Sequence, residues 1–493
     1  MLINLRNISS SPCHSHSQSH EIELPLSKSE SNRALMILHY SNNLKNRKSE
    51  NLKVSDSDDT ILLCQLLNKI NEQSLSTVEL DCANAGTVFR FLLTAVANLQ
   101  LTINNEQLTI DCEDSDPQVL RFSSSQILSF LLTGSERMKS RPISPLVDAL
   151  RSLGVSIDYT EREGYPPVLL TMPSDNRQQS MDNSQFSILN RVEVCAEQSS
   201  QFASSLLLAA PTWKNGLELH LTGRLSSLPY IDMTINMMKR CCIDVERNDR
   251  IITVKPGTYN IENITIEPDW SAAAFWYEAV ALSIDNGQQS TEILLKNLNI
   301  HSLQGDAVVM KMFESLGVET VSSDRGVVIR RSQGRRVAGS QGLKSIVNSQ
   351  QLINFTRQQI FNCQFSTFNF MDCPDLFPAV IATCAGLGVD ATFTGLKNLS
   401  IKESDRKQAM INELKKINIS FDDISDDILK MKCPESLPYF TEENPITFNN
   451  YGDHRIAMAL SILSLKIGAI EMENPEVVSK SYPGFWNNGQ ILG

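Results

Sequence analysis

One local pattern recurs along the chain and constrains its fold more than any other feature. It consists of an amphipathic helix, a tight turn and a strand of β-forming residues. Four segments carry it: DALRSLGVSIDY from Asp148, NMMKRCCIDVERN from Asn236, KMFESLGVETVSS from Lys311 and NELKKINISFDD from Asn412. In the first segment Val155, Ile157 and Tyr159 alternate and point to one face of the expected strand. The pattern predicts an α/β fold.

A second repeat supports internal duplication. The hexapeptides LKNLNI at Leu295 and LKNLSI at Leu396 are nearly identical, and each leads into a polar turn and a helix. Their spacing is longer than the period of a solenoid, so duplicated βα units are the better interpretation. The polar segments 176–190 and 331–365 are expected to be surface insertions.

Bulk composition narrows the class of protein. A chain of 493 residues with 41% hydrophobic content is too long for one small core, so two domains are expected. The net charge of −12 argues against a general nucleic-acid surface. No run of about 18 apolar residues predicts a membrane span, and the 11 cysteines lack CxxC pairs. We expect reduced thiols and a cytoplasmic location.

The N-terminal half places polar residues where helices are expected to begin. The segment LPLSKSESNRAL puts Lys28, Ser29 and Arg33 at a helix start, where unpaired N–H groups and the helix dipole favour an anion. A serine that only caps the helix is the alternative. In DCANAGTVFRFL, Gly86 permits close ligand approach, and Arg90 follows one turn later. A turn with a surface arginine is the alternative there.

Three further segments repeat this arrangement. Arg141 directly precedes Pro142 in GSERMKSRPISPLVDAL, which suits the first turn of a helix. Neutral donors open the helix of SSQFASSLLLAAP, and a serine precedes the proline-started helix of LSSLPYIDMT. These donors are Ser199, Ser200, Gln201 and Ser227.

The C-terminal half adds carboxylates. They and their cationic neighbours lie in DCPDLFPAV, LSIKESDRKQAM, NNYGDHRIAMAL and VSKSYPGFW, and include Asp375, Lys402, Glu403, Arg406, Arg455 and Lys480. Taken alone, each segment is more typical of a solvated helix cap. Converging helix starts of this kind would form a positively charged site for two anionic substrates, with an Asp or Glu free for proton transfer.

With these motifs in this order over nearly its whole length, the chain resembles the EPSP synthase family, the 3-phosphoshikimate 1-carboxyvinyltransferases. The resemblance implies a two-lobed α/β fold with three βαβαββ repeats in each lobe and the active site in the cleft between lobes. One lobe would be residues 27–266, and the other would combine 1–26 with 267–493.

The resemblance also implies the reaction. The enolpyruvyl group of phosphoenolpyruvate would pass to the 5-hydroxyl of shikimate 3-phosphate through a tetrahedral intermediate, with release of phosphate. This reaction would belong to the shikimate pathway, which leads to chorismate and the aromatic amino acids. No cofactor, metal, nucleic acid or membrane partner is expected, and the protein would be a monomer.

Residue roles follow from the same resemblance. Asp375 would accept the proton of the attacking hydroxyl, Glu403 would protonate the methylene carbon, and Lys28 would be the third catalytic residue. Shikimate 3-phosphate would contact Lys28, Ser29, Arg33, Ser199, Ser200, Gln201, Ser227, Asp375, Asn398 and Lys402. Phosphoenolpyruvate would contact Lys28, Gly86, Arg141, Gln201, Arg406, Arg455 and Lys480.

Departures from the family pattern and two alternatives remain. Leu26 replaces a usual glycine, Gly452 a usual asparagine and Phe91 a usual proline. These departures bear on substrate affinity and on sensitivity to glyphosate, the family's inhibitor.

The first alternative is the sister enolpyruvyl transferase acting on UDP-N-acetylglucosamine, whose Lys-Asn start and loop cysteine are not evident. The second is a non-catalytic repeat scaffold, against which the intact Lys28, Asp375 and Glu403 argue.

Overall fold

The computed structural model describes residues 1–3, 20–41, 52–70, 77–106, 129–172, 190–262, 264–283, 292–332 and 366–489. The chain forms two compact units. Unit 1 comprises Met1–Pro25, Glu267–Ser400 and Ser404–Gly493, and unit 2 comprises Leu26–Ile266 and Ile401–Glu403. The predicted lobes differ from these units at residue 26 and in the placement of 401–403. The predicted insertions 176–190 and 331–365 lie almost entirely outside the described residues.

Unit 2 contains two four-stranded sheets of the same topology. In each, two parallel strands lie beside an antiparallel hairpin, in the orders β3-β4-β6-β5 and β7-β8-β10-β9. The first sheet and its helices are β3 (Val78–Asp81), α3 (Gly86–Glu106), β4 (Ser129–Thr133), α4 (Glu136–Lys139), α5 (Ser144–Ser152), β5 (Asp158–Tyr159) and β6 (Val168–Thr171). The second comprises β7 (Asn190–Cys195), α6 (Ser200–Ala209), β8 (Leu217–Thr222), α7 (Leu228–Arg240), β9 (Val245–Asn248) and β10 (Ile251–Val254).

Unit 1 repeats this topology twice, in the orders β14-β15-β17-β16 and β2-β11-β13-β12 read from the parallel pair. One copy comprises β14 (Ser366–Asn369), α11 (Phe377–Leu387), β15 (Ala391–Thr394), α12 (Arg406–Lys415), β16 (Ser420–Ser425) and β17 (Ile428–Lys432). The other comprises β2 (His20–Ile22), α8 (Trp270–Leu282), β11 (Glu292–Lys296), α9 (Val309–Glu314), β12 (Val318–Ser323) and β13 (Gly326–Arg331). In that copy residues 26–266 of unit 2 separate β2 from α8 in sequence. The chain therefore leaves unit 1 after β2 and returns to it before α8.

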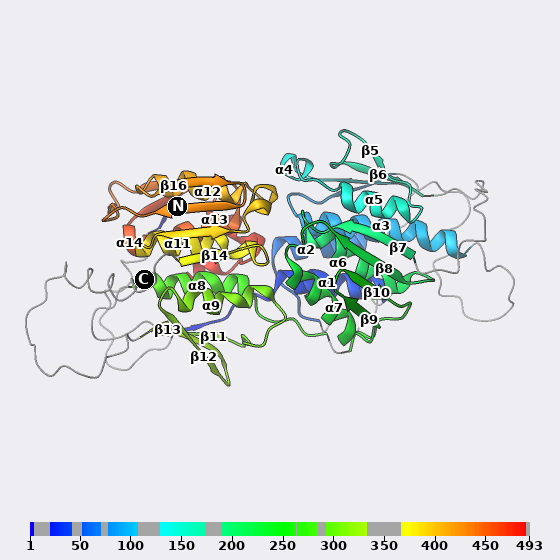
Figure 1. Cartoon of the computed structure of the whole chain (residues 1–493), viewed down its shortest axis with the longest axis horizontal. Helices are drawn as coiled ribbons and strands as arrows, with labels where there is room; N and C mark the ends of the chain where they lie inside the picture. Colours follow the sequence, from blue (N-terminus) through cyan, green and yellow to red (C-terminus); the bar gives the residue numbers. More distant parts are fainter. Residues whose placement is uncertain are drawn as a thin grey trace, which may run out of the picture. The chain divides into compact units, whose positions relative to one another are not determined.

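A third copy is partly represented in each unit. In unit 1, β18 (Ile446–Phe448), α13 (His454–Ile462) and β19 (Ile470–Met472) form a βαβ element, and β1 (Leu2–Ile3) pairs antiparallel with β19. In unit 2, the described residues include α1 (Lys28–Tyr40) and α2 (Asp58–Ile70). The predicted two-lobed α/β fold of repeated βαβαββ units is confirmed (Figure 1).

The four predicted helix–turn–strand segments all form, and their turns share one mechanism. After each helix a residue adopts positive φ: 91° at Gly154, 65° at Cys242, 84° at Gly317 and 65° at Asn418. In three of them the next N–H bonds back to a helix carbonyl, as Val155 N does to Leu150 O at 3.1 Å. This left-handed closure satisfies the helix end and turns the chain into the strand.

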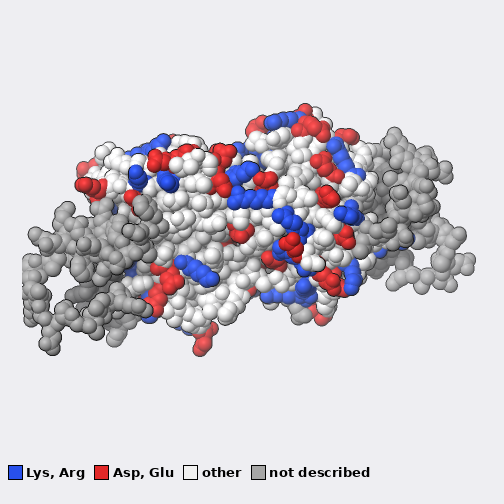
Figure 2. All heavy atoms as spheres, in the orientation of Figure 1, with Lys and Arg blue, Asp and Glu red and all other residues white. Residues whose placement is uncertain are grey.

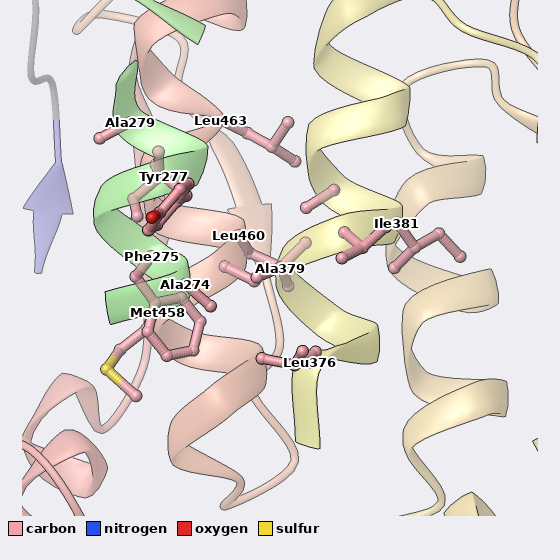
Figure 3. Packing of buried hydrophobic residues seen from close by; sticks show 14 of the residues in the cluster. Ala274, Phe275, Tyr277, Ala279, Leu376, Ala379, Ile381, Met458, Leu460 and Leu463 are labelled. Carbon is pink, nitrogen blue, oxygen red and sulfur yellow. The ribbon is translucent and has the colours of Figure 1, made fainter. Parts of the chain in front are cut away.

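The central helices of each unit are buried along their length. All 13 residues of α8 are buried, as expected of a helix that is apolar all round. Figure 3 shows its side chains packed with those of α11 and α13; the labelled residues are Ala274, Phe275, Tyr277, Ala279, Leu376, Ala379, Ile381, Met458, Leu460 and Leu463. In unit 2, every residue of α6 except Gln201 is buried. Because these helices are buried along their length, a ligand can contact them mainly at their first turns.

Candidate active site

Most of the predicted site residues lie where a helix begins. Lys28 and Gly86 are the first residues of α1 and α3, Ser199 and Ser227 are the N-caps of α6 and α7, and Arg406 is the first residue of α12. Free N–H groups and the positive end of the dipole favour anions at these positions. One detail differs from prediction: the first-turn proline of α5 is Pro145, so Arg141 and Pro142 precede the helix.

At the start of α1, Lys28 and Arg33 have different surroundings. Lys28 Nζ forms an ion pair with Asp59 Oδ2 at 2.9 Å. Arg33 is 2% exposed, and it donates to Thr234 Oγ1 at 2.7 Å and to Tyr230 O at 3.2 Å. Burial lowers the pKa of Arg33 to about 10. The Arg33 guanidinium therefore fastens α1 to α7.

Two further guanidiniums meet at Gly86. A Cβ built on Gly86 would lie 2.5 Å from Arg90 Nη1 and 2.7 Å from Arg141 Cζ, so this contact needs glycine. Burial lowers the pKa of Arg90 well below its usual value; the charge of Arg141 adds to this and that of Glu403 opposes it. Two buried, adjacent cations gain strongly from an anion placed between them.

Gln201 holds one member of this pair, Arg90, in place. Its Oε1 accepts from Arg90 Nη1 at 2.7 Å, and its Nε2 donates to Thr87 Oγ1 at 2.7 Å. The bond from Arg90 also fixes which end of the amide is oxygen, because a guanidinium can only donate. Gln201 thus ties the start of α6 to the first turns of α3.

The serines of unit 2 divide into caps and a strained residue. Ser199 Oγ accepts from Gln201 N at 3.2 Å and so caps α6, while Ser200 is buried in its first turn. Ser227 precedes α7 with φ 55° and ψ 36°, and its hydroxyl caps none of the α7 N–H groups. Left-handed backbone is uncommon outside glycine and concentrates at functional sites.

The segment Ile401–Glu403 belongs to unit 2 although unit 1 flanks it in sequence. Arg137 donates to Lys402 O from Nε at 3.1 Å and from Nη2 at 2.9 Å. Asn84 Nδ2 donates to Glu403 O at 3.4 Å. The half-buried Glu403 therefore belongs with the residues around Gly86.

In unit 1 the site is organised around Asp375. Its Oδ1 pairs with Arg406 Nη1 at 2.7 Å and its Oδ2 with Arg455 Nη2 at 2.9 Å. Burial opposes the charge of Arg455, but nearby carboxylates, Asp375 first, outweigh burial and raise its pKa. Arg406 Nε also pairs with Asp453 Oδ2 at 2.8 Å. One carboxylate thus joins the starts of α11, α12 and α13.

The remaining predicted residues of unit 1 lie in short 3-10 helices. Lys480 ends η7 (Pro475–Lys480), which packs against α13, and it is 9% exposed. Asn398 is half-buried in η6 (Lys397–Ile401). The predicted site residues thus divide between the two units. Unit 2 holds Lys28, Ser29, Arg33, Gly86, Arg141, Ser199, Ser200, Gln201, Ser227, Lys402 and Glu403, and unit 1 holds Asp375, Asn398, Arg406, Arg455 and Lys480.

The predicted site set left out residues that the structure places among these groups: Asp59, Arg90, Asp306 and Asp453. Arg90 follows Gly86 in the second motif but has no predicted role, and Asp453, in the segment NNYGDHRIAMAL, is the N-cap of α13. Asp306 follows LKNLNI, so the internal repeat pointed to its helix start. Asp59, which pairs with Lys28, carried no local signal.

The charged residues of both signs lie together on the surface. On the face in Figure 2, Lys and Arg side chains of the described residues are interspersed with Asp and Glu. Within the described ranges, no helix combines the length and apolar character that a membrane crossing requires.

Comparison with known proteins adds independent findings. A family model described as EPSP synthase (3-phosphoshikimate 1-carboxyvinyltransferase) matches residues 14–488. A Bacteroides fragilis protein named 3-phosphoshikimate 1-carboxyvinyltransferase is 33% identical over 96% of this chain and 95% of its own length. One of that name from Methanoculleus marisnigri is 28% identical over 77% of this chain and 78% of its own. A solved EPSP synthase from Acinetobacter baumannii shares the fold, with a TM-score of 0.60 at 20% identity over 97% of both chains.

Proposed function

The chain belongs to the EPSP synthase family, and from that premise we propose how its residues transfer the enolpyruvyl group of phosphoenolpyruvate to the 5-hydroxyl of shikimate 3-phosphate. The hydroxyl oxygen attacks C2 of phosphoenolpyruvate while C3 gains a proton, which gives a tetrahedral intermediate. Phosphate then leaves C2, and C3 returns a proton to the now ionised Glu403 to form the enol ether.

Unit 2 supplies most of the anion binding. Arg141, beside Gly86 and Arg90, receives phosphoenolpyruvate, and Gln201 orients the guanidinium of Arg90. Shikimate 3-phosphate is held by Lys28 together with Ser29, Ser199, Ser200, Gln201, Ser227, Asn398 and Lys402. Arg33 acts through the position of α1, because its guanidinium bonds to groups of the protein. Fixed donors of this kind stabilise charge without reorganising during the reaction.

Proton transfer is assigned to Asp375 and Glu403. Asp375 accepts the hydroxyl proton, and Glu403 donates to C3. In the structure two arginines share Asp375, which weakens it as a base. Phosphoenolpyruvate, bound by Arg406, Arg455 and Lys480, draws those arginines away and makes Asp375 more basic. The donor substrate thereby activates the base that the acceptor needs.

The bridge of Asp375 between two arginines is the observation that carries this proposal. The test is phosphate release from phosphoenolpyruvate with either shikimate 3-phosphate or UDP-N-acetylglucosamine as acceptor. We expect phosphate release when shikimate 3-phosphate is the acceptor and none when the nucleotide sugar is the acceptor. Release with the nucleotide sugar instead would assign the sister activity, and no release with either acceptor would favour the scaffold.

A further inference from the structure

A buried carboxylate on α12 holds the segment that leads into α13. Glu413 is 1% exposed. Its Oε1 accepts a hydrogen bond from the hydroxyl of Tyr451 at 2.9 Å, and its Oε2 accepts from Asn449 N at 2.9 Å and from Lys416 Nζ at 2.6 Å. Asn412, the residue before Glu413, donates to the Tyr451 hydroxyl at 3.5 Å. Helix α12 thus fixes both the backbone and a side chain of the segment before α13.

That segment is a turn with two successive residues in the left-handed region. The φ angle is 53° at Tyr451 and 64° at Gly452. Left-handed backbone is unfavourable for tyrosine and persists only where the surroundings hold it. Tyr451 N donates to Asn449 Oδ1 at 2.7 Å and Gly452 N to Asn450 Oδ1 at 2.9 Å, while Asn450 Nδ2 donates to Glu473 O at 2.6 Å. These bonds and the one to Glu413 define the turn.

The turn delivers two residues of the site. Asp453 N donates to Asn450 O at 2.8 Å, and Asp453 Oδ1 accepts from Arg455 N at 3.0 Å and so caps α13. Asp453 Oδ2 pairs with Arg406 Nε at 2.8 Å. Arg406 and Glu413 lie two turns apart on one face of α12. The same helix therefore holds the turn at two points, one of them the guanidinium of Arg406.

We propose that Glu413 and Tyr451 are positioning residues for the binding of phosphoenolpyruvate. Their hydrogen bond holds the left-handed turn, and the turn sets where α13 begins and hence where Arg455 lies relative to Arg406. The inference rests on the proposed function, because it requires these two arginines to bind phosphoenolpyruvate. Glu413 and Tyr451 act through the arginines.

Loss of the Tyr451 hydroxyl should therefore affect one substrate more than the other. Without it a buried oxygen of Glu413 loses its donor, and the turn loses a bond that offsets its backbone strain. The start of α13 can then shift and carry Arg455 with it, and a displaced donor binds an anion less well. Shikimate 3-phosphate is held mainly by unit 2 in the proposed function, so its binding should change little.

The test is the KM of Tyr451→Phe for each substrate at saturating concentrations of the other. We expect the KM for phosphoenolpyruvate to rise by up to about tenfold, the loss of affinity equivalent to one hydrogen bond. The KM for shikimate 3-phosphate and kcat should change much less. The matched control is Tyr277→Phe, which removes a hydroxyl bonded to Thr320 Oγ1 at 2.9 Å elsewhere in unit 1. Both its KM values should equal those of the wild type.

A second variant reaches the same bond from the other side. Glu413→Gln has one acceptor oxygen where the carboxylate has two, so it too should raise the KM for phosphoenolpyruvate. In the double variant the rise should fall well short of the product of the two single rises, because both changes loosen the same turn. If Tyr451→Phe fails to fold, Glu413→Gln decides by the same criterion.

The outcomes separate the inference from the proposed function. With an active wild type, an unchanged KM for phosphoenolpyruvate in Tyr451→Phe, an equal rise for both substrates, or the same rise in Tyr277→Phe overturns the inference alone. Absence of phosphate release by the wild type with shikimate 3-phosphate overturns the proposed function.

Discussion

Units 1 and 2 are built from the same βαβαββ repeat, yet the helix starts of the two units carry opposite chemistry. In unit 2 they present Lys28, Arg90 and Arg141 with neutral donors. In unit 1 carboxylates surround two arginines; the carboxylates are Asp269, Asp306, Asp375 and Asp453. The repeat thus fixes where functional side chains lie, and the residue types at those positions decide what they do. Under the proposed function, unit 2 contributes most of the anion-binding donors together with Glu403, and unit 1 contributes the base Asp375 between its two arginines.

The largest effect is expected at the centre of unit 1. Asp375→Asn preserves shape but removes the base and leaves Arg406 and Arg455 without their shared carboxylate. We expect kcat to fall by about 10³-fold, within the usual range for loss of acid–base catalysis. Asp372→Asn, in the same segment, is the matched control and should remain active. Equal activity of the two variants would contradict the role of Asp375 as the base.

A smaller loss is expected for the carboxylate that lies with unit 2. Glu403→Gln keeps the size and hydrogen-bonding capacity of the side chain but removes its proton. Turnover should fall by about 10²-fold, with KM for both substrates little changed. Steady-state kinetics at several substrate concentrations separate the two parameters. Near-normal turnover would remove Glu403 from the chemistry.

Gly86→Ala tests the anion site of unit 2. The added methyl would meet the guanidiniums of Arg90 and Arg141, and overpacking of this kind costs about 1–3 kcal/mol. Glyphosate is longer than phosphoenolpyruvate and should lose more affinity. We expect the wild type to be inhibited competitively with phosphoenolpyruvate, and the inhibition constant of the variant to rise more than its KM.

The matched control is Gly257→Ala, whose Cβ would make an ordinary 3.4 Å contact with Ile243 Cδ1 in the same unit. It should leave both constants unchanged. If Gly86→Ala and the wild type bind glyphosate equally, Gly86 does not line the donor site.

The smallest effect concerns a buried carboxyl outside the arginine network. Neither carboxylate oxygen of Glu278 has a hydrogen-bond partner among the described residues, and burial raises its pKa well above 4.5. Folding must therefore keep Glu278 protonated, which costs stability increasingly as pH rises above its unfolded-state pKa. Glu278→Met removes that cost. The melting temperature of the variant minus that of the wild type should therefore be larger at pH 8 than at pH 4.5. The increase should be a few °C, on the order of 2–4 °C for each kcal/mol of stability. A pH-independent difference would show that Glu278 ionises freely.

Local sequence signals predicted the scaffold well. Apolar periodicity, together with Gly154, Gly317 and Asn418 after their helices, located the recurring units, because a left-handed residue ends each helix. Polar residues ahead of apolar helices located most helix starts. Both signals depend only on residues close together in sequence, and the structure has its helix starts and helix ends where these signals predicted them.

Long-range pairings were beyond those signals. The partner of Lys28 is Asp59, 31 residues away, and the partner of Arg33 is Thr234, 201 residues away. The resemblance placed Arg33 among the ligand-binding residues, and the structure adds that its guanidinium joins α1 to α7. Asp306 was not predicted because the charged groups that act on it, Asp375 and Arg455, lie far from it in sequence.

The central claim is that fixed carboxylates move protons to and from the donor substrate while fixed cations hold it. The most direct measurement is the deuterium content of the enolpyruvyl methylene group after turnover in D₂O. Protonation at C3 followed by loss of a proton predicts deuterium in the product, in the wild type and, much more slowly, in Glu403→Gln. A product formed in D₂O without deuterium at that carbon would contradict the tetrahedral intermediate and the role assigned to Glu403 as the proton donor to C3.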